Sequence, residues 1–119
     1  MLRHDSPLHL FERTATSDVV IEGVTIRAGE RIAALLGAAN RDPAVFESPD
    51  EFRPDRDSNP HLAFGAGIHF CIGAPLARLE LETSMGVLLR RFGRLEVVQA
   101  ARRPSFVLRG YESLLVRPA

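Results

Sequence analysis

The segment Phe64–Gly73 constrains the fold of this 119-residue chain more than any other stretch. It holds the only cysteine, Cys71, and its glycines permit positive φ angles and close approach of the backbone to a flat ligand. An apolar pattern directly after it predicts a helix over Ile72–Phe92, with Pro75 near the first turn and Gly93 at the end. A thiolate placed there is stabilised by backbone N–H groups and by the helix dipole, which suits it to ligate a metal.

The predicted helix is apolar on two faces. One stripe consists of Ile72, Leu76, Leu79, Thr83 and Val87, and the other of Leu81, Met85, Leu88 and Phe92. A helix of this kind belongs in the interior of a larger protein, whereas a chain of this length buries only a modest fraction of its surface. We therefore expect residues 1–119 to be the C-terminal part of something larger.

The segments before the cysteine predict short elements and one long irregular stretch. Residues 2–5 resemble the last turn of a helix that Ser6 and Pro7 end. Val19–Ile26 predicts a hairpin, and Ile32–Leu36 predicts a buried strand. Residues 40–73 contain four of the eight prolines with aromatic residues between them, which favours a packed loop over disorder.

The last 27 residues predict three further strands, at Leu95–Val98, Phe106–Leu108 and Leu114–Val116. Together with the helix they indicate an α+β fold with a small β region, a long loop, one long buried helix and a C-terminal hairpin. Composition excludes several classes of function. Lysine plus arginine and aspartate plus glutamate number 15 each, so no bulk charge favours nucleic acid or a membrane surface.

Two observations concern the compartment. The apolar run of residues 32–39 is far too short to span a bilayer, and the first residues lack the apolar region of a secretory signal. One cysteine excludes an internal disulfide, which fits a reducing environment. We therefore expect a cytoplasmic protein without membrane or nucleic-acid partners.

Three other interpretations of Cys71 deserve comparison. A lone cysteine is most often a buried and inert residue. A Cys-His hydrolase would need an oxyanion hole and an orienting residue, and no such pattern accompanies Cys71. A zinc site would need several ligands at regular spacing, whereas the four histidines are scattered.

The pattern Phe-Gly-x-Gly-x-His-x-Cys-x-Gly at residues 64–73 resembles the heme-binding signature of the cytochrome P-450 (heme-thiolate monooxygenase) family, bacterial type, at every specified position. The resemblance extends over nearly the whole chain. Residues 11–16 are similar to the segment after the family's K helix, residues 37–43 to its short helix before the meander, residues 52–56 to its meander arginine motif and residues 74–82 to the start of its L helix.

The resemblance implies heme b as cofactor and a role for each matching residue. Cys71 would be the axial thiolate, Phe64 the aromatic residue beside it, and His69 and Arg13 the partners of the heme propionates. The remaining assignments are Gly65 and Gly67 in the heme-binding loop, Ile72, Gly73 and Ala74 as N–H donors toward the sulfur, Arg3 and Arg56 in a Glu-Arg-Arg network, Ser6, Pro7, Leu8, Val107 and Leu108 as substrate-lining residues, and Arg78 as a contact for a ferredoxin-type electron donor.

For Arg78, a solvated helix residue paired with Glu82 is an equal alternative. The resemblance also implies parts that this sequence does not hold. The network's glutamate would precede Met1, together with the distal half of the heme pocket. A truncated gene product, a mis-assigned start codon and one half of a split protein all fit this pattern.

Two hypotheses on function remain open. The first is part of a monooxygenase that hydroxylates a small organic substrate with O₂ and ferredoxin electrons, active only with the missing N-terminal portion. The second is a non-catalytic remnant with weak or no heme binding.

Overall fold

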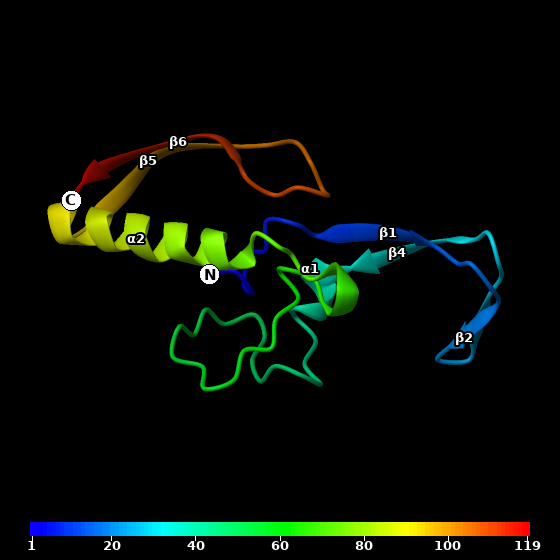
Figure 1. Ribbon diagram of the computed structural model, residues 1–119. Coiled ribbons are helices and arrows are strands. Elements are labelled where there is room, and N and C mark those ends of the chain that lie inside the picture. Colours follow the sequence, from blue (N-terminus) through cyan, green and yellow to red (C-terminus); the bar gives the residue numbers. More distant parts are fainter. The chain divides into compact units, whose positions relative to one another are not determined.

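The computed structural model describes all 119 residues (Figure 1). The chain forms two compact units, residues 1–63 with 106–108 and residues 64–105 with 109–119. Its elements are β1 (Leu10–Thr14), β2 (Val19–Ile21), β3 (Val24–Ile26), β4 (Arg31–Leu35), α1 (Leu36–Ala39), the 3₁₀ helix η1 (Gly67–His69), α2 (Ala74–Phe92), β5 (Leu95–Arg102) and β6 (Tyr111–Pro118). The predicted combination of short strands and one long helix is confirmed.

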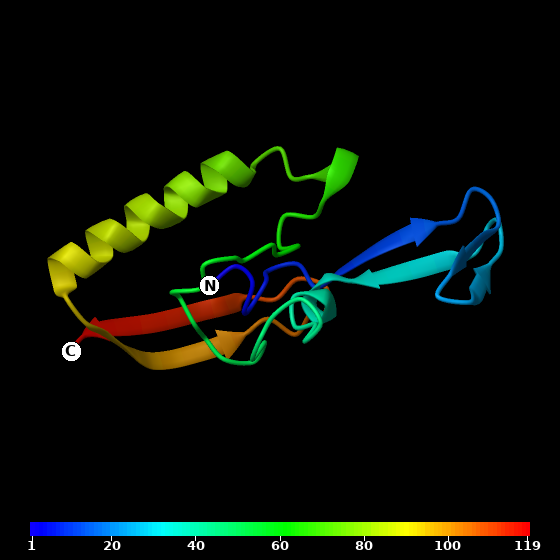
Figure 2. The ribbon, with the colours of Figure 1, turned by 90° about the horizontal axis from the view of Figure 1, so that it is seen from below.

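The first unit contains two antiparallel strand pairs (Figure 2). Strands β2 and β3 form the predicted hairpin, in which Val19 lies opposite Ile26. Its two-residue turn has positive φ at both positions, 48° at Glu22 and 79° at Gly23. Such a turn matches the right-handed twist of the two strands, and the glycine adopts it without steric cost.

Strand β4 was expected to be buried, and that expectation is wrong. Its position is as predicted within one residue, and it pairs only with β1, from Leu10 opposite Leu35 to Thr14 opposite Arg31. Four of its five residues are exposed. A two-stranded ribbon leaves both faces open, so an unbroken apolar run is not sufficient to make a strand buried.

The stretch from residue 40 to residue 73 is irregular, as predicted, apart from η1. It is nonetheless anchored, because Phe46 and Ala63 are buried at 4% and 6% exposure. The expected helical turn at the N-terminus is present as a single turn, closed by the Asp5 N–H donating to the Met1 carbonyl at 3.2 Å.

The second unit consists of the Cys71 loop, α2 and the β5–β6 hairpin. Helix α2 begins two residues later than predicted, after Gly73, and ends at Gly93 with a φ of 67°. Strands β5 and β6 extend the two predicted segments to eight residues each. The strand expected at Phe106–Leu108 is wrong, because those residues form only a single bridge between Leu108 and Leu8 in the first unit.

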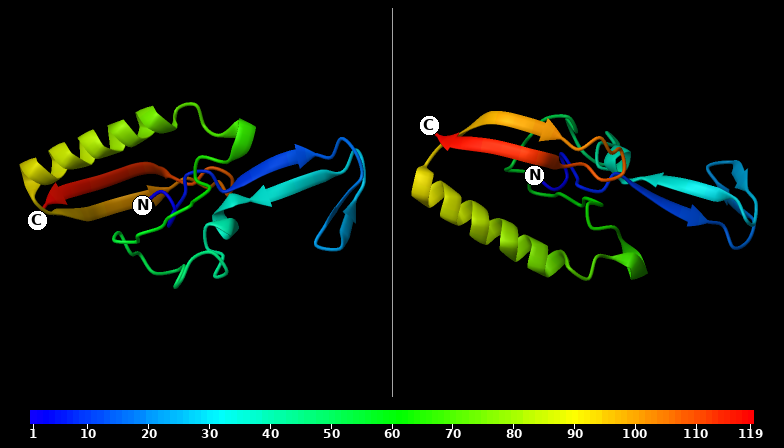
Figure 3. Two further views of the ribbon diagram at one scale, coloured as in Figure 1. Left: turned by 60° about the horizontal axis from the view of Figure 1, so that its bottom comes forward. Right: turned by 90° about the horizontal axis from the view of Figure 1, so that it is seen from above.

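Helix α2 was expected to be buried and is mostly exposed in this chain. Leu76 and Leu79 are 60% exposed, and only Ala74 is buried. Figures 2 and 3 show helix α2 followed by the β5–β6 hairpin, to which a short connection joins it. The hydrophobic core is accordingly small, since the buried apolar residues of the whole chain are Leu36, Phe46, Ala63 and Ala74.

We expect the purified 119-residue chain to melt without a sharp transition. Folded domains retain about 5–15 kcal/mol of unfolding free energy mainly by burying apolar surface, and this chain buries four apolar residues. Scanning calorimetry and far-ultraviolet circular dichroism should show a broad, non-coincident loss of structure. A sharp cooperative transition of the isolated monomer would contradict this expectation.

Candidate functional site

The loop around Cys71 is closed by backbone hydrogen bonds. The Cys71 N–H donates to the Phe64 carbonyl at 2.9 Å, so the first residue of the loop is tied to the cysteine. Between them, η1 is closed by the Phe70 N–H donating to the Gly67 carbonyl at 3.0 Å. Gly65 and Gly67 have φ angles of 71° and 62°, in the left-handed region that glycine adopts without strain. The positive φ values inferred from the sequence are therefore confirmed at these two positions.

The cysteine leads directly into α2. The Ala74 N–H donates to the Cys71 carbonyl at 3.1 Å, and the Ala77 N–H donates to the Gly73 carbonyl at 2.9 Å. The Ala74 N–H is therefore engaged by a carbonyl, and that Ile72, Gly73 and Ala74 donate toward the sulfur stays a prediction. Gly73 has a φ of −83°, so it is not needed for a left-handed turn, and a Cβ there would lie 3.8 Å from the Cys71 Sγ.

The surface around Cys71 has the chemistry of a site for a planar, largely apolar group. The thiol is free and exposed. Ile68 and Ile72 on either side of it are 98% and 99% exposed, and Phe70 is 51% exposed. The exposed ring of His69, at the C-terminal end of η1, adds a basic group beside this apolar surface. A soft sulfur ligand, exposed apolar side chains and a nearby basic residue fit a heme with its iron, its macrocycle and its propionates.

Phe64 and Arg78 connect the loop to α2. The Phe64 ring meets the Phe70 ring edge-on at a centroid distance of 6.3 Å. The Arg78 guanidinium lies over the Phe64 ring at 5.5 Å, a cation–π contact of about 0.5–1 kcal/mol at such an exposed position. Arg78 therefore has a partner within the loop, and the two alternatives expected from the sequence, contact with an electron donor and an ion pair with Glu82, stay predictions.

Arg13 belongs to the first unit and Cys71 to the second. The side chain of Arg13 is exposed on β1. It donates from Nη1 to the Glu12 carbonyl at 2.8 Å and lies over the Phe11 ring at 5.3 Å. Neighbouring Glu12 forms an ion pair with Arg31 across the β1–β4 pair. That Arg13 meets a heme propionate stays a prediction.

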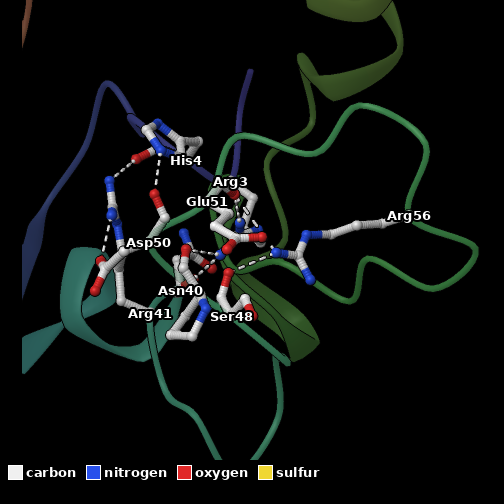
Figure 4. A network of polar contacts seen from close by, with 9 residues as sticks. Arg3, His4, Asn40, Arg41, Ser48, Asp50, Glu51 and Arg56 are labelled. Carbon is white, nitrogen blue, oxygen red and sulfur yellow. Dashed lines mark hydrogen bonds and ion pairs between the residues drawn. The ribbon is translucent and has the colours of Figure 1, made fainter.

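Arg3 and Arg56 converge on the loop at residues 47–51, as Figure 4 shows. Arg3 is 3% exposed and donates to the carbonyls of Asn40 at 2.7 Å, Pro49 at 2.9 Å and Glu51 at 3.4 Å. Arg56 donates to the carbonyls of Glu47 at 2.7 Å and Ser48 at 2.8 Å, and also reaches that of Glu51 at 3.5 Å. The two guanidinium groups thus hold the loop by its backbone rather than by carboxylates.

The charge of Arg3 is buried close to other cations. Burial and the nearby charges of Arg56 and Arg41 lower the pKa of Arg3. The group nevertheless stays charged at neutral pH, because arginine is effectively always protonated in proteins. Its hydrogen bonds to three carbonyls compensate the buried charge. One buried atom, Arg56 Nε, has no hydrogen-bond partner.

The segments expected to line a substrate site meet within the first unit. The His9 N–H donates to the Val107 carbonyl at 2.9 Å, and Leu8 bridges Leu108. Ser6, in contrast, is 1% exposed, and its hydroxyl donates to the Leu2 carbonyl at 2.8 Å. Its side chain therefore faces the interior, which leaves Pro7 and Leu8 as the lining candidates of this segment.

Sequence reasoning missed the most buried residue of this region. Asn40 is 0% exposed and bonds to Ser6, Arg3 and Leu62. An asparagine directly after a short apolar helix was the available signal, because this residue type favours helix ends and turns. No helix in the structure combines the length and the apolar character needed to cross a bilayer.

A cysteine loop closed onto the N-terminus of a helix, with an exposed thiol among apolar residues, has the features expected from the sequence for a heme-thiolate site. The sequence model of the family "Cytochrome P450" matches residues 1–118. The chain belongs to the cytochrome P450 family, a family of heme monooxygenases, and its bacterial members use redox partners.

Similar proteins match almost all of this chain but only part of their own length. The chain is 47% identical over 117 residues to the biotin biosynthesis cytochrome P450 of Bacillus subtilis, covering 97% of this chain and 30% of that protein. It is 45% identical to the steroid C26-monooxygenase of Mycolicibacterium smegmatis, covering 98% of this chain and 30% of that protein.

Solved structures agree. A crystal structure of P450BioI in complex with an acyl carrier protein ligated to hexadec-9Z-enoic acid superposes with a TM-score of 0.95 at 46% identity, covering 99% of this chain and 31% of that one. CYP109E1 from Bacillus megaterium in complex with testosterone gives a TM-score of 0.95 at 38% identity, covering 98% and 33%. The chain thus has part of the P450 fold and spans about a third of the length of these relatives.

Replacing Gly67 by alanine tests the left-handed turn of the loop. A side chain at a φ of 62° costs about 1–2 kcal/mol, so local opening of the loop should rise about tenfold. Amide hydrogen exchange at Phe70 and Cys71, whose N–H groups close the loop, should accelerate by that factor. Gly110→Ala is the matched control, because a Cβ there meets nothing within 4 Å at an ordinary φ. Equal exchange in both variants would contradict the role of the turn.

Proposed function

We propose that this chain is the proximal, thiolate-bearing part of a heme monooxygenase and that Cys71 is the axial ligand of the iron. The observation that supports it best is the Cys71 loop, in which backbone bonds to Phe64 and Ala74 hold an exposed thiol at the start of α2. The proposal places all 119 residues in the C-terminal portion of one P450 domain. It covers the family's activity, hydroxylation of a small organic substrate with O₂, for the complete protein rather than for this chain alone.

The residues of the chain would divide the work of holding heme b. Cys71 supplies the sulfur, and Gly65 and Gly67 let the loop backbone approach the macrocycle. Phe64 packs beside the sulfur, and His69 and Arg13 donate to the two propionates, since two carboxylates require two basic partners. N–H groups of Ile72 and Gly73 oriented toward the sulfur would tune its basicity. When bound, a thiolate-ligated heme supplies oxygen activation, because the thiolate raises electron density on the iron and favours O–O bond cleavage.

The same proposal assigns an electron donor and a second polypeptide. Arg78 is exposed on α2 next to the Cys71 loop, where a cationic side chain suits an acidic ferredoxin. The exposed apolar residues of α2 suit the portion of a P450 that corresponds to the rest of its relatives' length. The similar solved structures are complexes with molecules as different as an acyl carrier protein ligated to hexadec-9Z-enoic acid and testosterone, so they do not single out one substrate for this chain.

One observation favours the second candidate, a non-catalytic remnant with weak or no heme binding. The proposed heme partners are divided between two units, Arg13 in one and Cys71 and His69 in the other, and the chain has only four buried apolar residues. A heme held by so small a core would dissociate readily. The two candidate functions differ in the heme binding and the product formation expected when a polypeptide that spans the rest of a P450 is added.

Cys71→Ser should abolish thiolate ligation. The reduced, heme-loaded chain with carbon monoxide should show the red-shifted Soret band of a thiolate-ligated heme, and the serine variant should lack it. His69→Gln is the matched control, because it keeps the sulfur and removes a propionate partner: the band position should persist while heme affinity falls about tenfold. An unchanged band in the serine variant would refute the assignment of Cys71.

The chain alone should not hydroxylate substrates. Controlled proton delivery and exclusion of water at the distal side of the heme need residues that are absent here, so electrons should end in peroxide. The assay supplies heme, a ferredoxin, its reductase and a panel of apolar substrates, with and without a polypeptide that spans the remaining length of a relative.

Product formed only in the presence of that polypeptide would support the monooxygenase proposal. Product from the chain alone would refute the expectation of inactivity. Failure of the reconstituted mixture to bind heme would favour the remnant.

A further inference from the structure

Asn40 connects three segments that are far apart in the sequence. It follows α1, and its backbone N–H donates to the Leu36 carbonyl at 3.0 Å. Its side-chain Nδ2 donates to the Ser6 Oγ at 2.7 Å, and its Oδ1 accepts from the Leu62 N–H at 2.7 Å. All of these residues belong to the first unit, and Asn40 is fully buried.

The two segments that Asn40 holds lead to the two parts of the candidate site. Ser6 precedes Pro7 and Leu8, and the N–H of the next residue, His9, donates to the Val107 carbonyl. The segment of residues 6–9 is therefore fixed at one end by Asn40 and at the other by residues 107–108. These are the segments proposed to line the substrate site.

Leu62 lies two residues before Phe64, the first residue of the Cys71 loop. It is followed by Ala63, which is buried and donates its N–H to the His61 Nδ1 at 3.2 Å. The next residue is Phe64, whose carbonyl accepts from the Cys71 N–H. Ala63 and Phe64 are consecutive, and the backbone is thus hydrogen-bonded on both sides of the peptide bond that joins them.

An amide side chain of this length makes both bonds while the Ser6 hydroxyl donates to the Leu2 carbonyl. Asparagine offers a donor and an acceptor at once, whereas an ionised aspartate only accepts and alanine does neither. The bond to Ser6 is buried and the bond to Leu62 is partly buried, so a lost partner leaves a polar group without a hydrogen bond where water is largely excluded. The choice of residue is therefore specified by the simultaneous contact with Ser6 and Leu62.

We propose that Asn40 is a positioning residue that fixes the substrate-lining segment at Ser6 and the start of the heme-ligand loop at Leu62 through one side chain. The assignment of those two segments rests on the proposed function. The coupling of the two backbone segments through Asn40 does not rest on the proposed function, and it is measurable without heme.

The test compares Asn40→Ala, Asn40→Asp and Ser6→Ala in the full 119-residue chain by amide hydrogen exchange, with exposed Asn59→Ala as the matched control. In Asn40→Ala, exchange should accelerate about tenfold at Leu62, at His9 and at Cys71, because the hydrogen bonds to Ser6 and to Leu62 are both lost. In Asn40→Asp the Leu62 bond survives, so His9 should accelerate while Leu62 and Cys71 keep the wild-type rate. Ser6→Ala should behave like Asn40→Asp.

A merely structural role predicts a different pattern. It would accelerate the amides of the β5–β6 hairpin, such as those of the Val97–Val116 pair, by the same factor as Cys71. That result, or an unchanged Cys71 rate in Asn40→Ala, would overturn the proposal. If Asn40→Ala does not fold, the contrast between His9 and Leu62 in Asn40→Asp decides, and equal acceleration of both amides would refute separate anchoring.

Heme titration of the same variants adds the readout that depends on the proposed function. Asn40→Ala should reduce the thiolate-type Soret band of the reduced carbon monoxide complex about tenfold at limiting heme, and Asn40→Asp should leave it unchanged. Exchange rates that follow the proposal without any thiolate-type band in the wild type would refute the heme assignment and leave the role of Asn40 supported.

Discussion

The first unit depends on the hydrogen bonds that the buried guanidinium of Arg3 makes. A cation at 3% exposure must find acceptors, because removing a charge from water without hydrogen bonds is prohibitively costly. Arg3 finds them in the carbonyls of Asn40, Pro49 and Glu51, and a cation–π contact with the buried Phe46 completes its environment. A loop without regular structure thereby acquires one backbone path, since any other path would leave the charge unsatisfied.

The second unit is organised differently, by the geometry of the backbone. Two left-handed glycines and the bond from Cys71 to Phe64 close the loop, and α2 begins one turn later. None of these features requires a hydrophobic core, which explains how the thiol can be well placed while Ile68 and Ile72 beside it remain almost fully exposed. A site of this kind presents an apolar surface that a planar cofactor would cover.

Local sequence signals predicted the elements well and burial poorly. The hairpin around Glu22 and Gly23 and the end of α2 at Gly93 follow from turn and capping chemistry, which acts within a few residues. Burial of β4 and α2 was inferred from apolar patterns, and such patterns state only which faces avoid water, not whether this chain covers them. Asn40 escaped notice because its role arises from partners 34 and 22 residues away, which no window of local sequence reveals.

The exposed apolar faces and the close superposition on known P450 structures are both explained by how the backbone path of this chain is specified. A TM-score of 0.95 over nearly the whole chain means that these residues have the path they have in relatives about three times as long. With four buried apolar residues, packing within this chain does not account for that agreement. Turn glycines, carbonyls gathered around Arg3 and the bonds of Asn40 specify the path locally. The apolar residues of α2 then carry a different kind of information, the shape of a surface that a further polypeptide would have to match.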